Sequence, residues 1–261
     1  MIIKNGRIYD PISETITQGD LYLIDGKIAA ILETGMQDES KKSQLLEITE
    51  DHNEEILDAR GLMIAPGFMD VHVHFRDPGF TYKEDIETGS LAAAKGGFTR
   101  VVLMANTNPV VDNVHTLSEI LEKGKKTGIH VDSCATVTKG LKGREITSFS
   151  ELVSAGAVGF TDDGIPIVNE TILREAMIKA KELQVPLSLH EEDPALIKNS
   201  GINQGKAALE LGIEGAPREA EYALTKRDLQ IAKETGCKVN IQHISSKEAV
   251  ELVRQAKKEG V

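Results

Sequence analysis

Two histidines separated by one residue, His72 and His74, are the clearest chemical feature of the sequence. In an extended strand, successive side chains alternate between the two faces, so His72 and His74 point the same way while Val71 and Val73 point into the other packing layer. Two neighbouring imidazoles on one face can bind one divalent metal ion. The spacing alone fits a pair of surface or hydrogen-bonded core histidines equally well.

Further polar residues stand at the ends of later apolar segments, at Asn106, Asp162-Asp163, His190 and Gln242-His243. Four of the seven histidines therefore fall at the C-terminal ends of three predicted strands. In a (β/α)₈ barrel these strand ends surround one active site, so residues that are distant in sequence converge there. Carboxylate and imidazole ligands together favour zinc among the divalent metals. The sequence therefore predicts a zinc site at this rim of a barrel.

The elements that would position these residues alternate between strands and helices from residue 61 onward. We predict strands at Phe68–His74, Arg100–Ala105, His130–Val137, Ala157–Asp162, Pro186–His190 and Lys238–His243. Helical patterns separate them, at Glu84–Lys95, Leu117–Lys126, Phe149–Ala155, Glu170–Leu183, Glu219–Thr235 and Lys247–Lys258. Such an alternation predicts a parallel sheet, and a barrel is favoured over a dinucleotide-binding sheet because no G-x-G-x-x-G follows any strand.

The fold class expected is α/β, with an incomplete (β/α)₈ TIM-type barrel in residues 61–261. A complete barrel needs eight units and about six are recognised, so we expect the N-terminal part of a longer protein. Residues 1–60 hold short β-prone runs and the hairpin signal Asp25-Gly26, and are expected to form part of a small β-sandwich. The charged segment 36–55 is interpreted as a solvated excursion, in which His52 is not expected to bind a metal.

Composition and charge exclude several classes of function. The 261 residues carry 30 Lys and Arg against 41 Asp and Glu, and this net charge of −11 argues against a nucleic-acid-binding surface. No apolar run approaches the roughly 20 residues that span a bilayer, and the N-terminus lacks a secretory signal, so a cytoplasmic protein without a membrane partner is expected. Cys134 and Cys237 are too few for a disulfide framework and are expected to be buried thiols.

Four strings of residues carry a resemblance to a known family: H-V-H-F-R-D-P-G from His72, N-T-N-P at 106–109, D-D-G at 162–164 and G-A-P-R-E-A-E at 215–221. Together they resemble the amidohydrolase superfamily and, within it, the dihydroorotases of many bacteria. The resemblance implies that His72 and His74 bind a first metal ion and that His190 and His243 complete a second position. It also implies that Asp163 stands where related hydrolases carry a carboxylated lysine, with Asp162 as the rival for that role.

The same resemblance implies a reaction, the reversible cyclisation of N-carbamoyl-L-aspartate to L-dihydroorotate in de novo pyrimidine biosynthesis, with one or two zinc ions. Arg76 and Asn106 match residues that hold the substrate carboxylate beside His74, and a guanidinium suits this task because it can make two parallel charge-assisted hydrogen bonds. The alternative for Arg76 is a surface salt bridge with Asp77.

In the family an Asp at the end of the eighth strand, in an S-D-x-A-P-H-like motif, moves the proton. That motif is absent from this sequence. The catalytic residue is therefore expected beyond Val261, and the chain as given is expected to hold metal without turning substrate over.

Two other functions compete with this interpretation. One is another cyclic amidohydrolase, an allantoinase or a hydantoinase-like enzyme; hydantoinases normally keep the lysine of the fourth strand, whereas 160–164 reads F-T-D-D-G. The other is a non-catalytic dihydroorotase-like subunit that supports aspartate carbamoyltransferase. Such subunits typically lose metal ligands, and every ligand expected through the sixth strand is present here. The partners expected are a small-molecule substrate, a second copy in a homodimer, and aspartate carbamoyltransferase.

Overall fold

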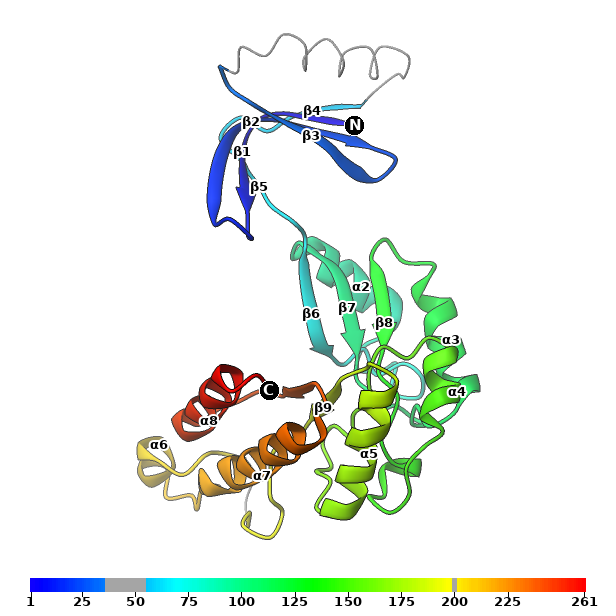
Figure 1. The fold of residues 1–261 in the computed structure, drawn as a ribbon, viewed down its shortest axis with the longest axis vertical. Helices are drawn as coiled ribbons and strands as arrows, with labels where there is room; N and C mark the ends of the chain where they lie inside the picture. The colour runs from blue at the N-terminus through cyan, green and yellow to red at the C-terminus, as the bar shows by residue number, and fades with distance from the viewer. Residues whose placement is uncertain (36–54, 199–200) are drawn as a thin grey trace. The chain divides into compact units, whose positions relative to one another are not determined.

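The computed structural model describes residues 1–35, 55–198 and 201–261 (Figure 1). The chain divides into two compact units, Met1–Gly67 and Phe68–Val261. The units divide after Gly67 rather than after Arg60, because Met63 and Ile64 pair with the first strand of the chain. The charged segment, including His52, lies outside the described residues except for Glu55.

The first unit is a five-stranded mixed sheet. Its strands are β1 Ile2–Asp10, β2 Thr15–Ile24, β3 Lys27–Glu33, β4 Ile56–Asp58 and β5 Met63–Ile64. The order is β3-β2-β1-β4, with β5 also on β1, and β4 and β5 run parallel to β1. Asp25 and Gly26 form the predicted hairpin turn between β2 and β3 with φ of 50° and 71°, as a type I′ turn requires. A small hydrophobic core of this unit is formed by the buried side chains of Ile2, Tyr22 and Leu32.

The second unit is a parallel sheet that follows chain order. Its strands are β6 Phe68–Val73, β7 Phe98–Leu103, β8 His130–Ser133, β9 Leu187–Leu189 and β10 Val239–Ile241. β6, β7 and β8 pair in sequence, as do β9 and β10. The fourth predicted strand contributes Phe160 as a bridge between the two groups, since it pairs in parallel with both Ala135 and Leu187. The predicted α/β fold, an incomplete barrel with an N-terminal β unit, is confirmed.

Helices lie between the strands as the pattern predicts. They are α2 Ile86–Lys95, α3 Val114–Gly124, α4 Phe149–Ser154, α5 Glu170–Glu182, α6 Lys206–Glu210, α7 Glu219–Thr235 and α8 Lys247–Lys258. Asp85, Asn113, Asn169 and Ser246 cap four of them through side-chain oxygens. The short helix α6 was not predicted. None of the described helices has the length and apolar character that a membrane crossing needs.

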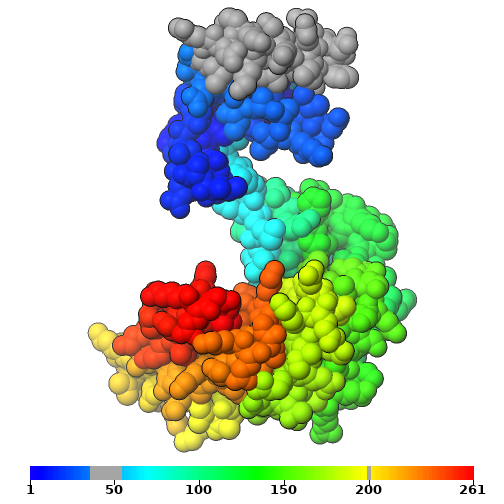
Figure 2. All heavy atoms as spheres, viewed as in Figure 1, coloured from blue at the N-terminus to red at the C-terminus, as the bar shows by residue number. Residues whose placement is uncertain are grey.

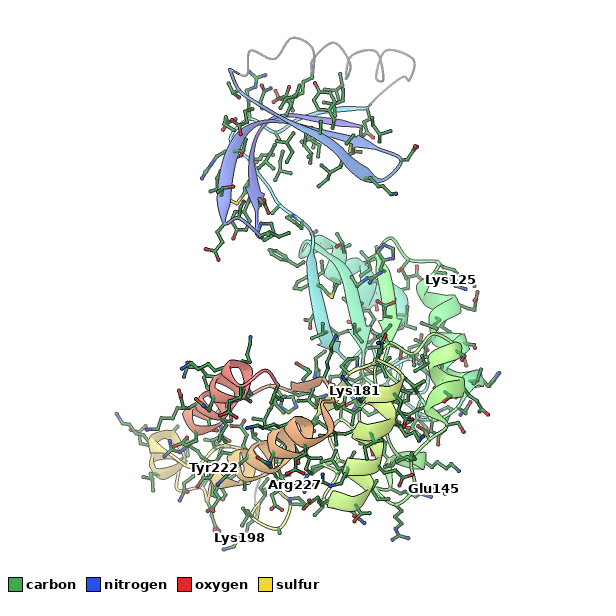
Figure 3. The ribbon with its side chains drawn as sticks, viewed as in Figure 1. Lys125, Glu145, Lys181, Lys198, Tyr222 and Arg227 are labelled. Atoms are coloured by element: carbon green, nitrogen blue, oxygen red, sulfur yellow. The ribbon has the colours of Figure 1, made fainter. Side chains whose placement is uncertain are left out.

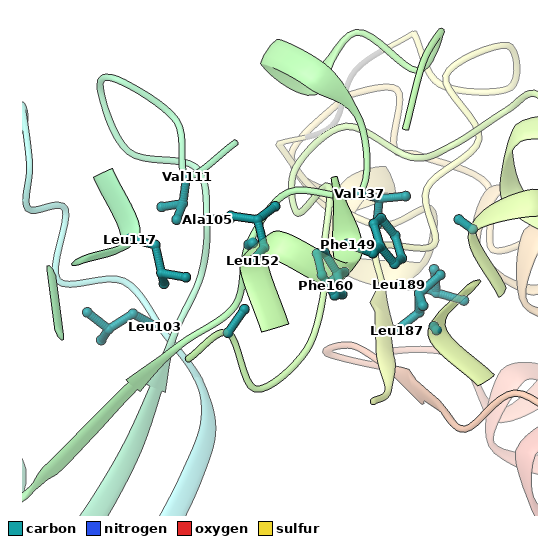
Figure 4. Close-up of a cluster of buried hydrophobic side chains, with 14 of the residues drawn as sticks. Leu103, Ala105, Val111, Leu117, Val137, Phe149, Leu152, Phe160, Leu187 and Leu189 are labelled. Carbon is teal, nitrogen blue, oxygen red and sulfur yellow. The ribbon is translucent and has the colours of Figure 1, made fainter. Parts of the chain in front are cut away.

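The core of the second unit lies between the sheet and its helices, as Figure 4 shows for part of it. Phe149 of α4 stacks on Phe160, with ring centroids 3.7 Å apart and planes inclined by 4°. Phe160 is fully buried, so this contact fixes the fourth strand position even though its ladder is one residue long. Cys134 and Cys237 are free and buried, as predicted.

Helix α7 is tied to its neighbours on both sides. Arg227, labelled with Tyr222 on α7 in Figure 3, donates to the carbonyl oxygens of Ile167 and Val168, just before α5, at 2.8 and 3.1 Å. On the other side α8 packs along α7, the red and orange segments of Figure 2. The loops that precede α7 and α8 are therefore held close together.

Candidate metal centre

Five polar side chains meet where the parallel strands end. His72 belongs to β6 and His74 follows it, while His190 directly follows β9 and His243 follows β10 by two residues. Asp163 comes three residues after the bridging Phe160. These C-terminal strand ends share one edge of the sheet, which is where barrel enzymes place their active sites.

Asp163 lies at the centre of the cluster. Its Oδ1 is 3.7 Å from His72 Nε2, 3.5 Å from His190 Nδ1 and 3.7 Å from His243 Nε2, and its Oδ2 is 3.3 Å from His74 Nε2. The histidines also pair with one another, at 3.1 Å for His72 and His74 and 2.9 Å for His190 and His243. No other residue contacts all four imidazoles among the described parts of the chain.

These contacts define two sets of candidate ligands. We call His72, His74 and Asp163 the first ligand group, and Asp163, His190 and His243 the second ligand group. Within each group the three ligand atoms lie within 4.8 Å of one another. A divalent cation could replace the direct contacts within either group, with Asp163 common to both.

The protonation states that the site favours suit a cation. Burial raises the pKa of Asp163, but the imidazoles of His190, His243, His72 and His74 around it outweigh burial and hold the pKa well below its usual range. Burial lowers the pKa of His72 and of His74. An ionised carboxylate and neutral imidazoles are the forms that bind metals.

His190 differs from His72 and His74 because a second carboxylate, that of Glu192, faces it. Burial lowers its pKa, but hydrogen bonds with Asp163 and Glu192 reverse the sign and raise the pKa above its usual value. Glu192 Oε2 lies 3.2 Å from His190 Nε2, so this nitrogen is engaged while Nδ1 faces Asp163. Glu192 was not identified from the sequence, although it lies in the H-E-E-D string that starts at His190.

Asn106 bridges two members of the first ligand group, His74 and Asp163. Its amide nitrogen donates to Asp163 Oδ2 at 2.9 Å, and its Oδ1 lies 3.1 Å from His74 Nδ1. With the proton on Nδ1, His74 donates to Asn106 and presents Nε2 to Asp163, which is how protein partners commonly orient metal-binding histidines. Asn106, predicted to hold a substrate carboxylate, is engaged in this structure by two residues of the site.

The Arg76 guanidinium makes no hydrogen bond or ion pair with the described residues. The salt bridge with Asp77, the alternative considered above, does not form, because buried Asp77 pairs with Lys123 at 2.7 Å. Arg76 adopts a positive φ of 58°, and its charge adds to burial in lowering the pKa of His74. The positive charge of Arg76, without a partner among the described residues, therefore acts on the histidines.

Two of the recognised strings contact one another through their backbones. Asn108 N donates to Pro78 O at 3.1 Å, and a Cβ on Gly79 would lie 2.0 Å from Asn108 O. Gly79 has φ of +93°, a conformation that side chains disfavour. The loops that carry Arg76 and Asn106 are thus fixed relative to one another.

Asp162 faces away from the cluster. Its carboxylate accepts hydrogen bonds from the backbone N of Thr138, at 3.1 Å, and from the Thr138 hydroxyl. Burial raises the pKa of Asp162 to about 6, against these hydrogen bonds. Of the two adjacent carboxylates, the structure places Asp163 among the histidines.

A cavity of about 210 Å³ lies beside His190 and His243. Its polar lining, which the sequence did not identify as site residues, comprises Glu191, Glu192, Asn203, Arg218, Glu221 and Ser245. Arg218 and Glu221 belong to the G-A-P-R-E-A-E string, so the sequence signal was present without an assigned role. A larger cavity of about 730 Å³, beside His130 and Asp132, includes none of the predicted site residues in its lining.

Comparison with known proteins identifies relatives of this chain. The model of a family described as dihydro-orotase-like matches residues 61–249. The chain is 52% identical over 257 residues to a protein named dihydroorotase from Clostridioides difficile, covering 98% of this chain and 58% of that protein. It is 50% identical over 260 residues to one of the same name from Clostridium acetobutylicum, covering 100% and 58%. The chain thus spans 58% of the length of these relatives.

Solved structures with a similar fold are also found. An L-hydantoinase from Arthrobacter aurescens superposes with a TM-score of 0.78 at 27% identity, covering 99% of this chain and 56% of that one. A D-hydantoinase superposes with a TM-score of 0.73 at 24% identity, covering 99% and 55%, and this likeness shows the fold alone.

Proposed function

The chain belongs to the dihydro-orotase-like family, and on that premise we propose that it forms part of a metal-dependent cyclic amidohydrolase. The reaction proposed is the reversible cyclisation of N-carbamoyl-L-aspartate to L-dihydroorotate in de novo pyrimidine biosynthesis. The observation that carries this proposal is the convergence of four histidines on one buried carboxylate, Asp163, beside the guanidinium of Arg76, which has no partner among the described residues.

The residues of the centre fit zinc by their chemistry. His72, His74, Asp163, His190 and His243 would hold one or two ions, since imidazole nitrogen and carboxylate oxygen are common zinc ligands. Bound there, zinc supplies a Lewis acid that polarises a carbonyl and lowers the pKa of water.

The remaining side chains would bind and orient the substrate. Arg76 can hold a carboxylate through two parallel hydrogen bonds. In the ring-closing direction, the ureido nitrogen bonds to the side-chain carboxyl carbon of the substrate, and one carboxyl oxygen leaves as water. Asn106 and His74 are assigned to contacts with the same molecule, and the 3.1 Å contact between Asn106 Oδ1 and His74 Nδ1 supports treating them together. No residue of this chain is assigned the proton transfer, which the resemblance gives to the Asp of an S-D-x-A-P-H-like motif.

Sequence identity and the ligand residues both bear on the alternative functions. A hydantoinase-like or allantoinase activity is supported only by the shared fold, because the relatives named dihydroorotase are about twice as similar in sequence as the hydantoinase structures. A non-catalytic subunit for aspartate carbamoyltransferase would not need the intact ligand groups described above. A homodimer, an association with aspartate carbamoyltransferase and a cytoplasmic location are further proposals, which sedimentation, copurification and cell fractionation would test.

The test is a substrate panel on the full-length protein. Purified protein loaded with zinc should hydrolyse L-dihydroorotate, and should hydrolyse hydantoin, dihydrouracil and allantoin at least 100-fold more slowly. Bound metal should be measured in the same samples. Metal uptake with no hydrolysis of dihydroorotate would favour the non-catalytic subunit, and preference for hydantoin would favour the hydantoinase-like alternative.

A further inference from the structure

The G-A-P-R-E-A-E string, residues 215–221, connects two loops that follow ligand histidines. It leads into α7, whose first turn contains Glu221. The string has no part in the substrate contacts proposed above, yet Arg218 and Glu221 line the cavity beside His190 and His243.

Both carboxylate oxygens of Glu221 are used on the loop between β10 and α8. Oε1 accepts from Ser245 N at 2.7 Å and from Ser245 Oγ at 3.0 Å, and Oε2 accepts from Ser246 N at 2.7 Å. These donors lie two and three residues beyond His243. Hydrogen bonds to an ionised acceptor are stronger than neutral ones. Ser246 also caps α8, so the negative charge sits at the favourable end of that helix.

His243 needs such external support. Its φ is 28°, which is uncommon for a residue with a side chain, and its side chain is 49% exposed. The ring contacts two other imidazoles, His190 at 4.7 Å and His72 at 5.3 Å between centroids. Packing therefore restrains this ring little, and the backbone that follows it must fix its position.

The same string reaches the loop after β9. Ala220 O accepts from Asp193 N at 2.8 Å, three residues beyond His190. Adjacent residues of the string, Ala220 and Glu221, therefore hold the loops that follow His190 and His243. The first ligand group has separate support, since Asn106 contacts both His74 and Asp163 from the end of β7.

We propose that Glu221 is a positioning residue for the second ligand group: it holds the loop after His243 so that His243 and His190 can share one divalent cation with Asp163. The inference rests on the proposed function only for the presence of the cation. Loss of Glu221 should therefore weaken one cation position selectively and leave His72 and His74 able to bind metal.

The test compares Glu221→Gln with Glu219→Gln in the full-length protein. Glu219 lies in the same helical turn, carries the same charge and is exposed, so it controls for the effect of charge on α7. Zn²⁺ alone is the probe, with stoichiometry from equilibrium dialysis and affinities from calorimetry. We expect two ions for the wild type and for Glu219→Gln, and one tightly bound ion for Glu221→Gln, with the second about 10–100-fold weaker.

A second readout does not depend on metal. In the metal-free protein, the imidazole NMR resonances of His243 and His190 should shift most in Glu221→Gln. Those of His72, whose ring contacts His243, should shift less, and those of His74 should stay in place. If Glu221→Gln does not fold, Glu221→Asp is the second variant. It keeps the charge but shortens the side chain by one methylene, and should show the same pattern of metal affinities and imidazole shifts.

The outcomes separate this inference from the proposed function. Unchanged affinity for both ions in Glu221→Gln, or equal weakening of both, overturns the positioning role. Wild-type protein that takes up no zinc contradicts the proposed function, and the imidazole resonances then decide the role of Glu221. Shifts that are largest at His190 and His243 and absent at His74 support the positioning role, and unshifted resonances of His190 and His243 overturn it.

Discussion

Asp77 and Lys123 form an ion pair, 2.7 Å between Oδ1 and Nζ, that joins the segment after Arg76 to the last turn of α3. Asp77 is buried, whereas the Lys123 side chain is 40% exposed and also contacts Glu119 at 3.1 Å. The hydrogen bond with Asp77 raises the pKa of Lys123, against the effect of burial. A helix that contributes no ligand thus holds the loop of the proposed substrate-binding arginine.

Replacing Lys123 should destabilise the protein more than replacing a similar lysine nearby. In Lys123→Met the Asp77 carboxylate stays buried without its cation, so the free energy of unfolding should fall by about 1–3 kcal/mol, the lower values reflecting the exposure of Lys123. Lys125, labelled in Figure 3, pairs with Glu122 at the exposed surface. Lys125→Met should change stability by no more than about 0.5 kcal/mol. Urea unfolding measures the free energy of both variants. A loss in Lys123→Met no larger than that in Lys125→Met would show that the ion pair with Asp77 is dispensable.

Arg76→Lys should separate substrate binding from metal binding. A lysine keeps the charge but cannot reproduce the planar pair of donors, so we expect KM for dihydroorotate to rise by about tenfold or more. Bound zinc should be unchanged, because Arg76 belongs to neither ligand group. Arg100→Lys, at a salt bridge with Asp132, is the control. Unaltered steady-state kinetics in Arg76→Lys would remove Arg76 from the substrate site.

Asparagine substitutions at the adjacent residues Asp162 and Asp163 should differ in their effect on bound metal. Asp163→Asn removes the charge that both ligand groups share, so metal content should fall at both positions. Asp162→Asn should keep its metal, but it turns an amide toward the two Thr138 donors and should cost about 1–3 kcal/mol of stability. Metal analysis and thermal unfolding of the pair test this. Loss of metal in Asp162→Asn alone would reverse the assignment.

Gly79→Ala should damage the contact between the loops that carry Arg76 and Asn106. The added Cβ would meet Asn108 O at 2.0 Å, and the backbone keeps a positive φ, so a loss of about 2–4 kcal/mol is expected. Gly128→Ala adds a Cβ with no atom within 4 Å and should be nearly neutral. Chemical unfolding measures the difference, and a tolerated Gly79→Ala would mean that the loops can separate without cost.

The sequence predicted the convergence of the candidate ligands because strand ends are readable from apolar runs. Strand periodicity alone could not choose between Asp162 and Asp163, because a one-residue shift in register reverses which face a side chain occupies. The assignment of Asp163 came from the family resemblance. Thr138, which holds Asp162 away from the histidines, lies on a different loop and is paired with it only by the fold. The fourth strand was overestimated for a related reason: Phe160 is held by stacking on Phe149, a contact that no periodicity reveals.

Supporting residues escaped prediction even where their strings were noticed. Glu221 accepts from Ser245 and Ser246, which are 24 and 25 residues away, and two of these three hydrogen bonds come from backbone groups that carry no sequence signal. The short helix α6 was missed because five residues are too few to display a period. Patterns identify residues that alternate within one element, whereas contacts between loops appear only in three dimensions.

The contacts around Asp163 join residues that are distant in the sequence, and this has a consequence for the kinetics of folding. Asn106 bonds to it across 57 residues of chain, and His190 meets His243 across 53. Contacts between such distant residues require long loops to close first, so they form late when a polypeptide refolds from denaturant. Helices and hairpins such as the one at Asp25-Gly26 should appear well before the cluster is complete. Uptake of a coloured cation such as Co²⁺ would then lag behind the recovery of helical circular dichroism.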